Sequence, residues 1–175
     1  MKFMETFQPW DVISCSRRKC LYILNRIAIS RSNEIMRIDR NGTLEENWST
    51  GDDCGHLSVT DESNIVLTAY NKSKLNEYLP DGQLIGVINL FLDADSGCPL
   101  HAIKLTNGHF LVSHGYCDGD EHKVCMVDAG GNVLKSYGGN GGSDIEHICL
   151  IQSICASMEM DSCWSLIMET VEFCY

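Results

Sequence analysis

Basic residues are scarce in this sequence. Lys and Arg together number 13 against 24 Asp and Glu, which gives a formal net charge of −11. A protein dedicated to binding a phosphate backbone normally has the opposite balance. No apolar run approaches the roughly 20 residues of a membrane-spanning helix. The opening residues, MKFMETFQPWD, lack the apolar core of a secretory signal. Hydrophobic residues still make up 44% of the chain, so we expect a globular cytoplasmic protein.

The chain holds 10 cysteines, which bear on the compartment. Several of them lie inside apolar runs, such as Cys20 before Leu-Tyr-Ile-Leu and Cys125 within Lys-Val-Cys-Met-Val. An even cysteine count in a secreted chain would suggest a disulfide framework. Without an export signal, the cysteines are instead predicted to be reduced thiols that behave as small buried hydrophobes.

Short apolar runs separated by turn residues recur in the same order three times, at about residues 9–50, 55–92 and 99–139. Each group contains four strand-like runs. An Asn-Gly, Asp-Gly or Gly-Gly turn, with the glycine at Gly42, Gly82 or Gly131, precedes the fourth run. Four strands in 40–50 residues is the period of a β-propeller blade. The alternative, a β-sandwich, does not predict a matching order in each group. The predicted fold is all-β, a partial β-propeller of about three four-stranded antiparallel blades.

Three segments in which a strand-like run leads into a turn glycine carry a family resemblance, and two of them have the form Val/Ile-Asp-x-x-Gly. They end at the three turn glycines and span residues 34–42, 74–82 and 123–131. Residues 1–150 resemble part of an NHL-repeat β-propeller, the C-terminal domain of tripartite-motif proteins, in its invertebrate type. The resemblance implies a non-enzymatic protein–protein interaction scaffold, related to substrate recognition by tripartite-motif ubiquitin ligases, with a protein partner and no cofactor. An RNA-binding NHL propeller is the alternative, and a metal-dependent propeller lyase or lactonase is the second alternative.

The length and the last residues point to truncation. A closed propeller of this type needs about six blades, roughly 270 residues. Residues 151–175 contain no Lys or Arg and read as a frameshifted tail. In the shifted frame, the codons of Met158-Glu159 and Met160-Asp161 must both encode glycine, and the product can resemble the start of another blade. The alternative is an amphipathic helix, with Met160 and Trp164 on one face.

Two weak metal sites can be proposed from residue spacing. Zinc prefers four nitrogen or sulfur ligands, and four candidates lie within 12 residues: His114, Cys117, His122 and Cys125. The alternative is two ordinary strands joined by an acidic loop, with Cys125 in the core. Asp93 and Asp95 resemble the start of a calcium loop, but Lys104 stands where that loop needs a glutamate. We expect neither metal to be bound.

The only basic cluster consists of Arg17, Arg18 and Lys19, in a predicted turn between the first two strands. It is the candidate RNA-binding site, and the alternative is a charged turn on a solvated face. Ser113 and His114 are adjacent on a predicted strand, where neighbouring side chains point to opposite faces. No arrangement of a nucleophile with a base emerges, so the chain is not expected to be an enzyme.

Overall fold

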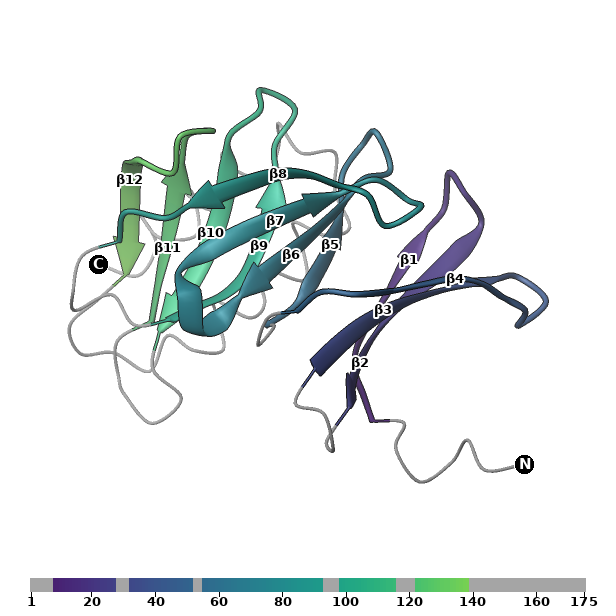
Figure 1. The fold of residues 1–175 in the computed structure, drawn as a ribbon. Helices are drawn as coiled ribbons and strands as arrows, with labels where there is room; N and C mark the ends of the chain where they lie inside the picture. The colour runs from purple at the N-terminus through teal and green to yellow at the C-terminus, as the bar shows by residue number, and fades with distance from the viewer. Residues whose placement is uncertain (1–7, 28–31, 52–54, 93–97, 116–121, 139–175) are drawn as a thin grey trace.

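The computed structural model describes residues 8–27, 32–51, 55–92, 98–115 and 122–138 (Figure 1). They form three sheets, each of four antiparallel strands in chain order. The predicted fold class is therefore confirmed: the described chain is a partial β-propeller of three blades. Residues 151–175, Cys117 and the Asp93–Asp95 segment lie outside the described residues. Among the described residues, no helix has the length and apolar character needed to cross a membrane.

Sheet 1 consists of β1 (Pro9–Cys15), β2 (Cys20–Ile27), β3 (Ser32–Asp39) and β4 (Leu44–Ser49). Sheet 2 consists of β5 (Leu57–Val59), β6 (Ile65–Ala69), β7 (Lys74–Tyr78) and β8 (Leu84–Asn89), with the short 3-10 helix η1 (Tyr70–Lys72) between β6 and β7. Sheet 3 consists of β9 (Cys98–Lys104), β10 (Phe110–Gly115), β11 (His122–Val127) and β12 (Val133–Gly138).

The turns that precede the last strand of each sheet share the same backbone conformation and hydrogen bonds. Gly42, Gly82 and Gly131 have φ values of 82°, 88° and 85°, in the left-handed region that favours glycine. Each glycine N–H donates to the carbonyl of the residue three positions earlier. In sheet 1 the carboxylate of Asp39 also accepts hydrogen bonds from the backbone of Asn41 and Thr43. These contacts close short, rigid hairpins where the sequence predicted them.

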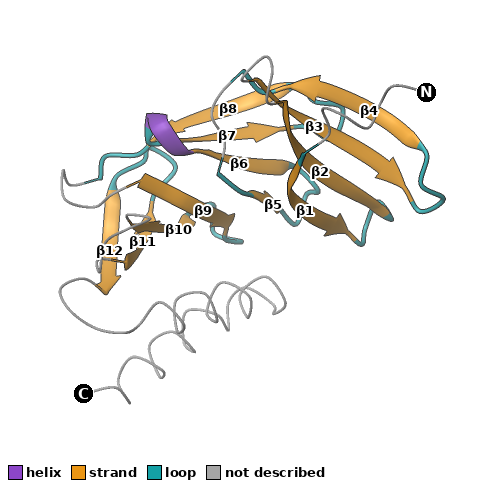
Figure 2. Ribbon diagram, turned by 90° about the horizontal axis from the view of Figure 1, so that it is seen from below, coloured by secondary structure: helices purple, strands orange, loops and turns teal. Residues whose placement is uncertain are grey.

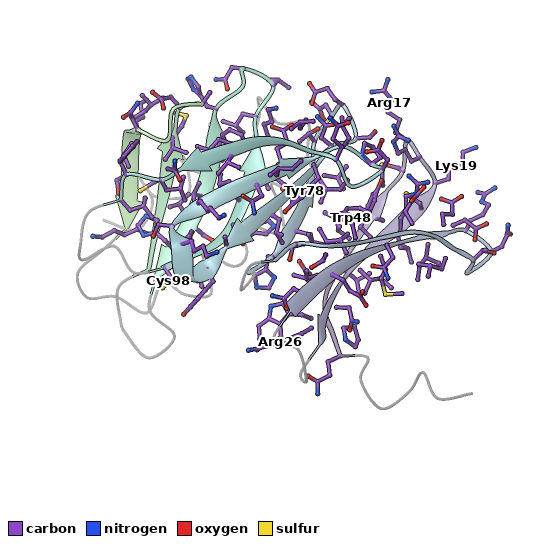
Figure 3. The ribbon with its side chains drawn as sticks, viewed as in Figure 1. Arg17, Lys19, Arg26, Trp48, Tyr78 and Cys98 are labelled. Carbon is purple, nitrogen blue, oxygen red and sulfur yellow. The ribbon has the colours of Figure 1, made fainter. Side chains whose placement is uncertain are left out.

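The first core lies between sheets 1 and 2. Tyr22 and Leu24 from β2 meet Leu67 from β6, and all three are at most 1% exposed. Trp48 lies between Tyr22 and Tyr78, with ring centroids 6.3 Å from each (Figure 3). The ring of Trp48 therefore connects β2 of sheet 1 with β7 of sheet 2.

The second core lies between sheets 2 and 3. Val66 and Leu75 from sheet 2 meet Phe110 and Val112 from sheet 3. All five residues of β6 are buried, because its alternate side chains enter the two different cores. A strand buried on both faces reads as a nearly continuous apolar run, and Ile65–Ala69 contains one polar residue, Thr68, whose hydroxyl donates a 2.9 Å hydrogen bond to the carbonyl of Leu100.

The three sheets stand in a row, with sheet 2 in the middle (Figures 1 and 2). β1 contacts β5, and β5 contacts β9, so the first strands of the three sheets lie beside one another. β4, β8 and β12 are the opposite edges of their sheets. The first strands thus form the inner edge of the arc, as the innermost strands of a propeller do.

Candidate functional site

A row of polar side chains follows the inner edge of the arc. Asp11 lies in β1, His56 directly precedes β5 and His101 lies in β9. The strand registers place these three residues at equivalent positions of the repeat. In each sheet, the next residue along the first strand pairs with the same position of the second strand. The row contains one carboxylate and two imidazoles, one from each sheet. It was not identified from the sequence, although each of the three residues lies near the start of one of the three repeated groups.

The row is held together by contacts between sheets. Oδ2 of Asp11 accepts a hydrogen bond of 2.7 Å from the backbone N–H of Leu57 and lies 3.4 Å from Nδ1 of His56. Nε2 of His101 lies 3.1 Å from the carbonyl oxygen of Leu57. The rings of His56 and His101 meet edge to face, with centroids 6.0 Å apart. Each of these contacts joins one sheet to the next.

The local environment sets the protonation states of two members. Burial alone would raise the pKa of Asp11, but hydrogen bonds from His56 and Leu57 outweigh it and lower this pKa below its ordinary value. Burial lowers the pKa of His101, so its imidazole is neutral at pH 7. A carbonyl oxygen only accepts hydrogen bonds, so the proton of the neutral ring is assigned to Nε2 and Nδ1 remains an acceptor. The row therefore presents an anion and a neutral acceptor at the inner edge.

The predicted basic cluster forms the exposed turn between β1 and β2 (Figure 3). Lys19 has a φ of 56° and closes the hairpin without a glycine. Nη1 of Arg17 donates a 2.9 Å hydrogen bond to the carbonyl of Asp61, which lies in the β5–β6 turn. A hydrogen bond with Thr60 is the main cause of the lowered pKa of Glu62, and the charges of Lys104 and Arg17 lower it further. The basic turn therefore lies against an acidic one.

The structure brings together two of the four proposed zinc ligands. Nε2 of His114 in β10 and Sγ of Cys125 in β11 lie 2.9 Å apart, and both residues are buried. Sγ of Cys125 also lies 3.4 Å from Oγ of Ser136. Cys117 and the side chain of His122 lie outside the described residues. Within the described ranges, no three His, Cys, Asp or Glu side chains are placed to hold a metal ion.

Two polar bridges join neighbouring sheets at equivalent positions. Arg37 of β3 donates a 2.8 Å hydrogen bond to the carbonyl of Pro80 and forms an ion pair of 3.0 Å with Glu45. At the matching position of β7, both carboxylate oxygens of Glu77 accept hydrogen bonds from Nζ of Lys104, at 2.8 and 3.0 Å. Neither bridge was identified from the sequence, because the partners belong to different sheets.

Comparison with protein-family models gives no match, and neither does comparison with curated proteins. Several solved structures are similar in fold. Streptogramin B lyase matches with a TM-score of 0.58 at 16% identity, over 81% of this chain and 44% of that one. A protein of unknown function from Bacteroides caccae matches with a TM-score of 0.56 at 16% identity, over 76% of this chain and 47% of that one. Virginiamycin B lyase from Staphylococcus aureus gives 0.54 at 14% identity, over 78% and 43%.

These neighbours are propeller-like proteins, and at this level of identity the similarity concerns the fold alone. The chain spans less than half the length of each of these three structures.

Proposed function

We propose that this chain is a non-enzymatic binding module of NHL-propeller type that presents its hairpin turns to a protein partner. The observation that carries the proposal is the mixed charge of the exposed turns. The basic turn Arg17–Lys19 lies beside the acidic residues Asp61 and Glu62. A protein surface with both signs of charge can complement such an area, whereas the phosphate backbone of RNA requires a uniformly positive surface.

The rigidity of the turns supports recognition. Asp128 accepts hydrogen bonds from the backbone of Gly130 and Asn132 within the β11–β12 turn, as Asp39 does in the equivalent turn of sheet 1. These hydrogen bonds lower the pKa of both carboxyl groups, with Asn132 as the main cause for Asp128 and Thr43 for Asp39. Turns fixed in this way lose little conformational entropy when a partner binds, which favours affinity.

A cytoplasmic location and a role in substrate recognition for a ubiquitin ligase belong to the same proposal. Cys15 and Cys20 are paired across β1 and β2, yet both are free thiols, and so are Cys98 and Cys125. Buried cysteines that pack as small apolar side chains accord with the proposed cytosolic location. Two of the similar structures are lyases, and their 14–16% identity supports catalysis only weakly.

The test compares protein and RNA binding through the basic turn. A variant with Arg17→Glu, Arg18→Glu and Lys19→Glu is compared with a control, Lys123→Glu with Lys135→Glu, which changes charges in sheet 3. Cross-linking followed by mass spectrometry in nuclease-treated lysate should place partner contacts on the hairpin turns of the wild type. The turn variant should lose these contacts, while the control keeps them.

RNA binding is measured separately with a fluorescently labelled single-stranded RNA of mixed sequence. We expect weak binding that changes little between the two variants. Tight binding that weakens steeply with salt and is abolished by the turn variant would refute the protein-partner proposal in favour of the RNA alternative. Partner contacts that persist in the turn variant would refute the assignment of the binding surface to the turns.

A further inference from the structure

Two cysteines face each other at the end of the β1–β2 hairpin. Cys15 is the last residue of β1 and Cys20 is the first residue of β2, and the strand register pairs them directly. Directly opposite residues of antiparallel strands project from the same face of the sheet. Both side chains are buried in the first core, and both are free thiols. The other described cysteines, Cys98 and Cys125, lie in β9 and β11, which are not neighbouring strands.

The repeat shows what the residues at this position do in another sheet. In the strand registers, Cys15 and Cys20 of sheet 1 correspond to Thr60 and Asn64 of sheet 2. The backbone N–H of Thr60 donates a 2.9 Å hydrogen bond to the carbonyl of Asn64, which closes the hairpin. The side chain of Thr60 adds a second contact, because its hydroxyl oxygen accepts a 3.2 Å hydrogen bond from the N–H of Asn64. In sheet 1, two thiols occupy the place of this side-chain contact.

The spacing of paired strands allows a disulfide between the two thiols. Directly opposite residues of antiparallel strands have Cα atoms about 4.5 or 5.5 Å apart, and a disulfide joins Cα atoms about 4.4–6.8 Å apart. Opposite Cβ atoms lie roughly 4.5–5.5 Å apart, whereas a disulfide brings them to about 3.8 Å. The bond must therefore draw the strands slightly together. A disulfide formed in this way is more easily reduced than a relaxed one, so the pair suits a reversible bond.

The surroundings of the pair control its access to solvent. Burial is the main cause that raises the pKa of the Cys20 thiol, and the neighbouring Cys15 raises it further. The thiols therefore stay protonated and unreactive while the hairpin is closed. The turn between them, residues 16–19, is exposed, and Lys19 has a φ of 56°, which is unfavourable for a residue with a side chain. Local opening at this end of the hairpin exposes both thiols together.

We propose that Cys15 and Cys20 form a reversible intramolecular disulfide by exchange with a small anionic disulfide of the glutathione type. The thiolate of one cysteine attacks a sulfur of the small disulfide, and one small thiolate leaves. The thiolate of the other cysteine then attacks the mixed disulfide, which forms the Cys15–Cys20 bond and releases the second small thiolate. The two cysteines lose two electrons to the small disulfide, and their two protons end on the two released thiols.

The basic turn favours this reaction. Arg17, Arg18 and Lys19 lie between the two cysteines, so their charges attract an anionic reagent and favour the thiolate once the hairpin opens (Figure 3). The disulfide closes a ring around this turn, whose Arg17 already donates a 2.9 Å hydrogen bond to the carbonyl of Asp61. Oxidation would therefore also alter partner binding through the turn. That consequence rests on the proposed function, whereas the disulfide itself does not.

The experiment follows the two cysteines by mass spectrometry. The full chain is incubated with oxidised glutathione at about pH 8, the remaining thiols are alkylated, and the chain is digested with trypsin. Trypsin cleaves after Arg17, Arg18 and Lys19, so the two cysteines leave in separate peptides, residues 3–17 and 20–26, unless a disulfide joins them. We expect the joined peptides to be the first disulfide product, and dithiothreitol to separate them again.

The matched control is the double variant Ser14→Cys with Cys15→Ser, which keeps the number of thiols. It moves one thiol a single residue along β1, where the side chain points to the opposite face of the sheet. Circular dichroism first establishes that the variant keeps its β-sheet content. The joined peptides should form at least about ten-fold more slowly than in the wild type, because the two thiols no longer face each other.

Three results would overturn the proposal. In the first, the two wild-type peptides stay separate, either unmodified or each carrying glutathione, so the second exchange step does not occur. In the second, Cys15 and Cys20 join other cysteines as readily as each other, so the strand register does not select the pair. In the third, the control forms the joined peptides as fast as the wild type, so the bond arises from unfolded chain. None of these results bears on the partner contacts of the turn, so failure here is distinct from failure of the proposed function.

Discussion

Replacing Gly131 with alanine tests the contact that closes the outer side of the second core. Gly131 has a φ of 85°, and a Cβ atom built on it would overlap the backbone carbonyl of Asn89. Its own carbonyl accepts a 3.0 Å hydrogen bond from the N–H of Phe91. The repeat supplies a matched control, because Gly42 occupies the equivalent turn of sheet 1 with a φ of 82° and has nothing within 4 Å of such a Cβ.

The two substitutions share one cost and differ in a second. An L-residue in the left-handed region costs about 1–2 kcal/mol, so Gly42→Ala should destabilise the chain by that amount. Gly131→Ala adds a clash with backbone, which cannot rotate away as a side chain can. Overpacking of this kind costs about 1–3 kcal/mol, and displacing the Phe91 hydrogen bond costs about 1 kcal/mol more. The expected total for Gly131→Ala is about 3–6 kcal/mol.

Urea unfolding followed by tryptophan fluorescence measures both costs, at one fixed protein concentration. Gly82→Ala should fall between the other two, because its Cβ would lie 2.6 Å from Cδ2 of the Trp48 ring, a side chain able to shift. Equal losses of stability in Gly42→Ala and Gly131→Ala would refute the reasoning. They would mean that the Asn89 backbone moves aside freely and that β8 and the β11–β12 turn do not constrain each other.

Three further predictions concern the inner row, the Glu77 bridge and the tail. The folded state lowers the pKa of His101, so the unfolded chain takes up a proton at this residue first as the pH falls. The contribution of His101 to stability is therefore complete above about pH 6.5 and declines below it. His101→Gln should flatten the dependence of the unfolding free energy on pH in that range, and an unchanged slope would contradict the assignment. Lys104→Ala should cost about 3 kcal/mol, because the buried Glu77 carboxylate loses its cation and keeps the hydrogen bond from the Asn64 side chain. Adding Glu77→Gln should restore part of the loss in the same urea assay, and no restoration would show that packing of the lysine stem dominates. Sequencing the transcript beyond codon 150 should reveal a shifted reading frame that encodes another blade, and immediate stop codons in that frame would refute the frameshift.

The turns and strands of this fold were predictable because they depend on local residues. Gly42, Gly82 and Gly131 mark hairpins because their turns need a positive φ, which glycine adopts without steric cost. Lys19 and Ser63 adopt positive φ values of 56° and 70° in the first hairpins of sheets 1 and 2, where no glycine marks the turn. There, the flanking apolar runs alone indicated the strands.

The contacts between sheets were not predictable, because they depend on how one sheet packs on the next. Asp11, His56 and His101 share a position in the repeat, and that much is readable from the sequence. Their contacts require the inner strands to lie side by side. His114 and Cys125 were grouped with their neighbours by sequence spacing. Their actual contact arises from the antiparallel register of β10 and β11, which places residues 11 apart on one face.

Sheet 2 stabilises the arc more than either of its neighbours. In β6, Ile65 and Leu67 pack in the first core and Val66 packs in the second, so this strand contributes side chains to both cores. In a chain of repeats, stability is the sum of each repeat and its interfaces with its neighbours. Sheet 2 has two such interfaces, whereas sheet 1 has one and leaves its other face to solvent. Every repeat in a closed propeller has two such interfaces, so any partner that covers the free face of sheet 1 would also stabilise that sheet, by an amount that depends on its affinity and concentration.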